Sequence, residues 1–210
     1  MAGFEAQRPV ARIDGLQFSY PHRRLFTNWS ARFPAGLSWV LGDEGSGKST
    51  LLRLLAGDLP AEAGRLQVAG VYLDQDTAHY CAQVFRTDPQ SELPQDLTPL
   101  QWLAGLQARY PGFDMAAVPA LLAQLHLEEH RNKPLFMLST GSRRKVWLVA
   151  AFASGAALTL VDQPFAALDK PSIVATLALL RAASAMPGRA WVVVDYVPPH
   201  GLVPAQTLVL

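Results

Sequence analysis

One short glycine-rich segment constrains the fold of this chain more than any other feature. Gly42, Gly47, Lys48 and Ser49 satisfy the spacing G-x-x-x-x-G-K-[ST]. The apolar run SWVLG leads into the segment, and the helical run LLRLLAG follows it directly. A strand, a glycine turn and a helix in this order point backbone N–H groups at one spot, at the positive end of the helix dipole. The segment therefore predicts a loop that binds phosphate groups.

The side chains of this loop predict a bound magnesium nucleotide. Lys48 supplies a positive charge for β- and γ-phosphates, and the hydroxyl of Ser49 can ligate Mg²⁺. The alternative is a turn that only joins a strand to a helix, but a chain of about 200 residues matches the motif by chance about once in a hundred cases. The expected nucleotide contacts are Gly42, Asp43, Glu44, Gly45, Ser46, Gly47, Lys48, Ser49 and Thr50.

A carboxylate follows a second apolar run, ALTLVDQP. A buried parallel strand that ends at Asp162 would deliver this carboxylate beside the glycine loop, where it would hold Mg²⁺ through water. The alternative is an aspartate that caps the next helix. Because the run follows the glycine loop in a strand-like segment, the metal role is favoured.

The pattern of apolar runs predicts one α/β domain over residues 1–210. Half of the residues are hydrophobic and 17% are charged, which supports a large core and excludes a disordered chain. Short strand-like runs come first, and strands alternate with helices again after Ser139. We expect a nucleotide-binding core over 1–88 and 136–210, which carries a mostly parallel sheet between helices. A helical insertion is expected over 89–135.

Three apolar segments are interpreted individually. The run 146–161 has 16 residues, fewer than the about 20 that span a membrane. It predicts a buried helix that breaks at Ser154-Gly155 and passes into a buried strand. The runs RLQVAGVYL (65–73) and CAQVF (81–85) predict two further strands.

Charge and cysteine content limit the partners and the compartment. The net charge of +1 argues against a nucleic-acid surface. Cys81 is the single cysteine, which excludes an internal disulfide and is compatible with a reducing compartment. The first fifteen residues lack the apolar stretch of a signal peptide. A cytoplasmic chain without a nucleic-acid partner is expected.

Further motifs resemble those of ABC-type ATPases. LSTGSRRKV (138–146) resembles the LSGGQ signature, and Asp162 follows Leu138 by 24 residues, as in that family. AALD, which ends at Asp169, resembles the D-loop, and Tyr20 stands where the family stacks an aromatic ring on adenine. The resemblance covers essentially the whole chain, and the chain is similar to compact bacterial subunits such as that of cytochrome c biogenesis.

The resemblance implies a P-loop NTPase fold of the ABC ATPase type. The expected fold is α/β, with a mixed sheet core, an N-terminal antiparallel part and the helical insertion. It implies that two ATPase domains, as a homodimer or heterodimer, enclose two ATP molecules. The signature residues Ser139, Thr140, Gly141 and Ser142 would contact the γ-phosphate bound to the other subunit. A plain serine cap is the alternative for LSTGS alone.

The same resemblance implies a membrane partner and a Q-loop glutamine. An integral membrane permease would dock on 89–135 and hold the chain at the inner face of the cell membrane. Gln75 lies 27 residues after Lys48, which is short for the family. Gln90 lies 42 residues after Lys48 and is the expected ATP and metal contact, although a plain surface glutamine is an equal alternative.

Two positions depart from the family pattern. The family carries Asp-Glu-Pro at its second carboxylate motif, where this chain has Asp162-Gln163-Pro164. An amide can hydrogen-bond a water but cannot accept its proton. Asp195 or Tyr196 stands where the switch histidine is expected, and a tyrosine hydroxyl can still donate to a γ-phosphate.

The expected function is therefore an ATPase subunit whose hydrolysis is slowed. Its catalytic residues would be Lys48, Asp162, Gln163 and Tyr196. Gln163 is open to three explanations: an introduced substitution that traps ATP, a natural one in a heterodimer whose partner hydrolyses ATP, or a regulatory ATP-binding module. A soluble ABC protein acting on nucleic acid or ribosomes and a small-molecule kinase are the other function classes. A soluble ABC protein of that class usually carries basic arms or a second ATPase motif, and this sequence shows neither. A small-molecule kinase would not need LSTGS or AALD.

Lys48→Ala is expected to abolish nucleotide binding, because the loop loses its charge for the β- and γ-phosphates. Titration of ATP by calorimetry measures this loss. Unaltered ATP affinity would contradict the assignment of the loop.

Overall fold

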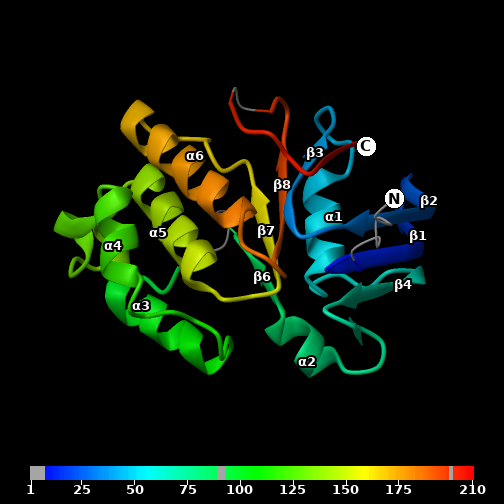
Figure 1. Cartoon of the computed structure of the whole chain (residues 1–210), viewed down its shortest axis with the longest axis horizontal. Coiled ribbons are helices and arrows are strands. Elements are labelled where there is room, and N and C mark those ends of the chain that lie inside the picture. Colours follow the sequence, from blue (N-terminus) through cyan, green and yellow to red (C-terminus); the bar gives the residue numbers. More distant parts are fainter. Residues whose placement is uncertain (1–7, 89–92, 199–200) are drawn as a thin grey trace, which may run out of the picture.

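The computed structural model describes residues 8–88, 93–198 and 201–210, which form two sheets with helices between and beside them (Figure 1). The antiparallel sheet has the order β2-β1-β4-β5. Its strands are β1 (Ala11–Tyr20), β2 (Arg23–Phe33), β4 (Ala63–Val68) and β5 (Val71–Tyr72). The parallel sheet has the order β6-β7-β8-β3-β9. Its strands are β3 (Gly36–Leu41), β6 (Val84–Arg86), β7 (Leu158–Asp162), β8 (Ala190–Asp195) and β9 (Gln206–Val209).

Helices cover both faces of the parallel sheet. Helix α1 (Lys48–Leu55) lies between the two sheets, and α5 (Thr140–Ala153) and α6 (Lys170–Ser184) lie on the opposite face (Figure 1). The remaining helices are α2 (Thr77–Ala82), α3 (Pro99–Gly105) and α4 (Val118–Gln124). Short 3-10 turns follow at Leu106–Ala108, Glu128–His130 and Leu135–Met137. The expected parallel sheet between helices, with an antiparallel N-terminal part, is confirmed.

The pleat of the parallel strands divides the buried residues into two cores. Val192 and Val194 of β8 face α1 and the antiparallel sheet, whereas Trp191 and Val193 face α5 and α6. Successive side chains of a strand point to opposite faces, so a strand covered on both sides must be apolar throughout. This requirement explains the continuous runs WVVV and LTLV.

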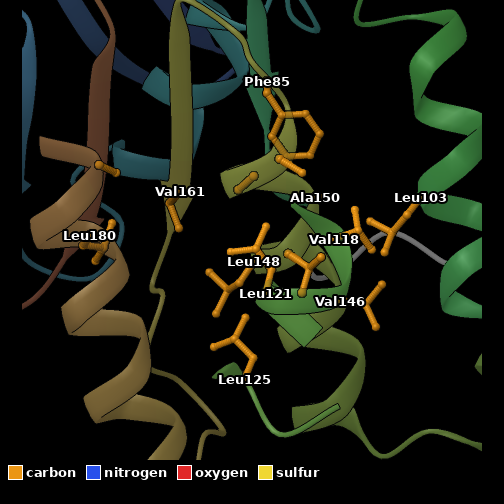
Figure 2. Close-up of a cluster of buried hydrophobic side chains, with 14 of the residues drawn as sticks. Phe85, Leu103, Val118, Leu121, Leu125, Val146, Leu148, Ala150, Val161 and Leu180 are labelled. Atoms are coloured by element: carbon orange, nitrogen blue, oxygen red, sulfur yellow. The ribbon is translucent and has the colours of Figure 1, made fainter. Parts of the chain in front are cut away.

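The helical insertion packs into the second of these cores. Leu103 of α3 and Leu121 of α4 are buried with Val146 of α5 in one cluster, which continues to Leu180 of α6 (Figure 2). Strand character is absent from the described part of 89–135, as expected. The insertion is therefore held on α5 chiefly by apolar burial, at about 25 cal/mol per Å² of apolar surface removed from water.

Two strand predictions were wrong in their bounds. The run 65–73 forms two strands, because Ala69 and Gly70 both take positive φ values, 49° and 85°, and close a tight hairpin turn. The run 81–85 is helical at its start. Asp76 accepts the N–H of His79 and caps α2, so the strand begins only at Val84.

Two further features concern the ends of elements. Helix α5 ends at Ala153 and β7 begins at Leu158, which confirms the predicted break at Ser154-Gly155. Strand β9 lies in a segment for which the sequence pattern predicts no element, and it pairs in parallel with β3. Within the described ranges, no helix is long and apolar enough to cross a membrane.

Gly155→Ala is expected to lower the free energy of unfolding by about 3 kcal/mol. Gly155 has φ 64°, and an added Cβ would collide with the carbonyl of Gly112, where the insertion meets the end of α5. Gly188→Ala is the matched control, because Gly188 has φ 74° but nothing within 4 Å. Its expected cost is about 1 kcal/mol, from backbone strain alone. Equal losses for both variants in urea unfolding would contradict the close packing at Gly112.

Candidate functional site

The glycine loop between β3 and α1 leaves backbone N–H groups free to bind an anion. Gly45 and Gly47 take φ values of 74° and 106°, which favour glycine. A Cβ on Gly42 would collide with Oγ of Ser46, a buried hydroxyl without a hydrogen-bond partner among the described residues. In the same part of the chain, the N–H groups of Glu44, Gly45 and Gly47 donate to no backbone or side-chain acceptor. The loop therefore presents a polar cradle with unmet hydrogen bonds.

Lys48 begins α1 and is almost fully buried beneath this loop. Its Nζ donates to the carbonyl oxygens of Gly42, at 2.6 Å, and Asp43, at 2.8 Å. The same Nζ lies 4.4 Å from the centre of the Tyr196 ring, a cation–π distance. The ammonium group is thus held at the loop by two carbonyls and one aromatic face.

Ser49 and Asp162 meet across 113 residues of sequence. The hydroxyl of Ser49 donates to Oδ2 of Asp162 at 2.6 Å. Hard oxygen donors suit Mg²⁺, which keeps several of its waters and takes further oxygens from phosphates. The described residues contain no group of three His, Cys, Asp or Glu side chains able to hold a metal. The hydroxyl and the carboxylate therefore fit a magnesium ion that is held mainly by water and phosphate oxygens.

Lys48, Ser49 and Tyr196 line one cavity of about 360 Å³, whereas Asp162 meets it through Ser49. The hydroxyl of Tyr20 lies 3.4 Å from Oγ1 of Thr50 at this cavity, and Tyr20 as a residue is 40% exposed. An exposed aromatic ring at a polar cavity is able to stack on a base. The lining consists of Tyr20, Arg23, Leu25, Glu44, Gly45, Gly47, Lys48, Ser49, Thr50, Gln163 and Tyr196.

Gln163 is held in an unusual backbone conformation at this cavity. Its φ is 46°, and its N–H donates to the carbonyl of Val194 at 2.9 Å. Residues other than glycine rarely adopt a positive φ, and such backbone strain is common at functional sites. The turn places the amide of Gln163 directly after Asp162, at the carboxyl end of β7.

Tyr196 lines the cavity, whereas Asp195 lies beside it at the end of β8. Burial raises the pKa of the half-buried Asp195 carboxyl, and the N–H of Tyr196, which donates to Oδ1 at 2.8 Å, opposes that shift. The neighbouring charge of Asp162 raises the pKa further, while Lys48 and Arg144 lower it. Asp195 thus carries an unfavourable charge at the strand end.

Ser139, Gly141 and Ser142 of LSTGS line a second cavity, of about 150 Å³. Ser139 caps α5, where its Oγ accepts the N–H of Ser142 at 3.1 Å. A Cβ on Gly141 would lie 2.6 Å from the carbonyl oxygen of Ala167. Thr140 begins the helix and is exposed. The lining is Ser139, Gly141, Ser142, Lys145, Ala167, Leu168 and Asp169, which includes no residue of the first cavity.

Asp169 has a structural task in this chain. Its Oδ1 accepts the N–H of Ser172 at 2.8 Å and caps α6. Hydrogen bonding from Ser172, by its side chain first and its backbone second, lowers the pKa of Asp169. Gln75 lies in the turn after β5 and lines neither cavity. Gln90 falls outside the described residues.

Sequence reasoning missed two arginines. Arg23 lines the first cavity, and only its place three residues after Tyr20 hints at this position. Arg144 lines a small cavity with Thr87 and Asp162. Its Nε is buried without a partner in the described part of the chain, and burial lowers the pKa of its guanidinium.

Known proteins resemble this chain in sequence. The model of the ABC transporter family matches residues 27–166. The cytochrome c biogenesis ATP-binding export protein CcmA of Yersinia pestis is 32% identical over 146 residues, 70% of this chain and 67% of that protein. CcmA of Pseudomonas syringae pv. tomato is 34% identical over 166 residues, 79% and 78% of the two chains.

Solved structures share the fold. An ATP-binding subunit of an ABC transporter has a TM-score of 0.81 at 23% identity, and the match covers 90% of this chain and 80% of that one. A dimeric ATP-binding cassette with ADP and Pi bound has a TM-score of 0.77 at 20% identity, over 89% and 88% of the chains. At these identities the likeness is one of fold.

Asp195→Asn is expected to raise the free energy of unfolding at about pH 7, because it removes a half-buried charge. The expected gain is only about 0.5 kcal/mol, since solvent screens the exposed half of the side chain. The folded-state pKa of Asp195 lies above its ordinary value, so the charge costs stability above that pKa. The gain should fade as pH falls through the raised folded-state pKa, and it should be absent below the ordinary aspartate pKa of about 3.9, where the carboxyl is protonated in both states. Urea unfolding at several pH values measures it, with Asp96→Asn on an exposed loop as the control. A gain that grows as pH falls would contradict the raised pKa.

Proposed function

Because this chain belongs to the ABC transporter family, we propose that it is the ATP-binding subunit of a transporter and binds Mg-ATP in the cavity of the glycine loop. The single observation that carries the proposal is the 2.6 Å hydrogen bond between Ser49 and Asp162. It joins the hydroxyl of Ser49, which can ligate Mg²⁺, to the carboxylate of Asp162, which can hold the ion through water. Ser49 directly follows Lys48 in the sequence.

The residues of the cavity would divide the nucleotide between them. Tyr20 stacks on the adenine, and the free N–H groups of Glu44, Gly45 and Gly47 donate to phosphate oxygens. Lys48 leaves the carbonyls of Gly42 and Asp43 to bind the β- and γ-phosphates. Bound Mg²⁺ supplies charge neutralisation for the terminal phosphates. The remaining expected contacts, Asp43, Ser46 and Thr50, belong to the same loop and helix start.

Hydrolysis would be slow in this chain, because Gln163 follows Asp162 where the family has glutamate. The amide orients a water beside the phosphate chain but cannot take its proton. Loss of a positioned general base costs about 10²–10⁴ in rate. Tyr196, which lies over Lys48, is the hydroxyl that would donate to the γ-phosphate.

A second ATPase domain would complete the site. The cavity of Ser139, Gly141 and Ser142 shares no lining residue with the loop cavity, which supports the view that one chain cannot bring both to the same phosphate. Two chains arranged head to tail would set the signature helix of each, with its positive N-terminus, against the nucleotide of the other. Asp169, at the rim of the signature cavity, would lie at this interface as the D-loop residue.

The transport role would require a separate membrane protein. Relatives carry the name of an export protein, and we propose a permease that docks on the helical insertion and holds this chain at the inner face of the membrane. Gln90 would serve as the Q-loop glutamine that reaches the metal. Gln163 favours a second candidate, an ATP-binding regulatory module that hydrolyses no ATP itself.

Gln163→Glu is expected to raise ATP turnover by at least about tenfold, because the carboxylate supplies the missing base. Phosphate release measures turnover, and light scattering follows the dimer that ATP and Mg²⁺ induce. The dimer should persist with Gln163 and dissociate after turnover in the variant.

The double variant Gln163→Glu, Lys48→Ala is the control and should lose the gained turnover. Unchanged turnover in the single variant would contradict the catalytic reading of position 163 and favour the regulatory module. A monomer at saturating Mg-ATP would contradict the two-domain site.

A further inference from the structure

The hairpin of β1 and β2 presents an arginine to the nucleotide cavity. Tyr20 and Arg23 are register partners that close this hairpin. Directly opposite residues of an antiparallel pair lie on the same face of the sheet. Tyr20 lines the cavity, and Arg23 lines it with Tyr20. The guanidinium therefore projects to the same side as the ring that would stack on the base.

The guanidinium reaches the glycine loop itself. A Cβ built on Gly45 would lie 3.0 Å from Nη1 of Arg23, 3.9 Å from its Cζ and 4.0 Å from its Nη2. Gly45 is one of the residues whose N–H group is free to bind an anion. An anion held at these amides would thus lie within the reach of Arg23, which lines the same cavity as Lys48.

The charge of Arg23 is not neutralised within the described residues. Arg12, Arg65 and Arg86 each pair with an aspartate, at 2.6, 3.1 and 2.7 Å. The side chain of Arg23 forms no ion pair or hydrogen bond in the described ranges, although Glu44 lines the same cavity. An arginine without a carboxylate partner beside free amides is a ready donor to phosphate oxygens, because its planar fork matches their geometry.

We propose that Arg23 contacts the phosphate chain of the bound nucleotide and sets the affinity of the cavity for ATP and ADP. This inference rests on the proposed function, because it concerns the same cavity. Arg23 is exposed, and no other side chain of the described residues holds its guanidinium in place. The guanidinium is therefore free to turn toward the phosphate chain when a nucleotide binds. Hydrogen bonds between charged groups contribute more binding energy than bonds between neutral groups, although exposure to solvent reduces that contribution. We therefore expect removal of the Arg23 side chain to weaken nucleotide affinity about tenfold.

The neighbouring Arg24 provides a matched control. It pairs with Ser19 in the register of the hairpin, and its Nε lies 3.5 Å from the hydroxyl of that serine. Neighbouring residues of a strand point to opposite faces, and Arg24 does not line the cavity. Arg23→Ala and Arg24→Ala therefore remove the same charge from the same exposed hairpin, on its two faces.

The test is calorimetric titration of ATP and ADP, with Mg²⁺, into the unmodified chain and the variants. Arg23→Ala should weaken both affinities about tenfold at about 0.05 M salt and by less than about threefold at about 0.5 M, where charges are screened. Arg23→Lys should retain part of the affinity, and Arg24→Ala should stay within about twofold of the unmodified chain.

Two outcomes would overturn the inference. Equal affinities of Arg23→Ala and Arg24→Ala for ATP would show that Arg23 makes no contact. A loss in Arg23→Ala that is the same at both salt concentrations would show a contact with base or ribose instead of phosphate. Comparison of the unmodified chain with Lys48→Ala distinguishes a failure of the Arg23 inference from a failure of the proposed function. If Lys48→Ala binds ATP as the unmodified chain does, the nucleotide site itself is wrong, and Arg23 falls with it.

Discussion

The parallel register of three strands is the constraint on which this site depends. Leu41 of β3 pairs with Asp195 of β8, and Asp162 of β7 pairs with Val194. The carboxyl ends of β3, β7 and β8 therefore meet at one edge of the sheet. Ligands of open α/β sheets bind at such edges, because loops and helix N-termini converge there. The hydrogen bond between Ser49 and Asp162 depends on this alignment and on the entry of α1 directly after β3.

That alignment is maintained by burial on both faces of the sheet. Trp39 and Trp191 pack on one side toward α5 and α6, and Val40 and Val192 pack on the other toward α1. A shift of register by one residue would exchange the two sets and move the tryptophans into the α1 core. The core thus fixes where Asp162 and Lys48 stand. The tight approach of Gly155 to Gly112 and the shared cluster of α3, α4 and α5 tie the helical insertion to the same framework.

The side chains at the carboxyl ends of these strands differ in the chemistry that they can supply. The groups proposed to hold phosphate and metal (Lys48, Ser49 and Asp162) are all present, and each forms a hydrogen bond at the site. Gln163 adopts the strained turn after Asp162 but offers an amide at its tip. A tight turn keeps its backbone when glutamate is replaced by glutamine, because the two side chains have nearly the same shape. Position 163 therefore offers the shape of a glutamate but no group that accepts a proton.

The sequence by itself determined the elements whose signal is local and periodic. The motif around Lys48, the runs LTLV and WVVV and the break at Ser154-Gly155 each depend on neighbouring residues, and each was predicted from them. The order of residues after LTLV also showed that Gln163, an amide, stands where the family motif has the carboxylate of glutamate.

Only the tertiary structure decided which distant groups meet. Short elements such as β9 and α2 carry too few residues to show a period, and β9 exists because β3 offers it a free edge. Arg23 and Arg144 reach the sheet edge through hairpin register and helix packing, which no spacing in the sequence reveals. The physical reason is that contacts across tens of residues are set by the packing of whole elements, whereas the sequence pattern reports only one element at a time.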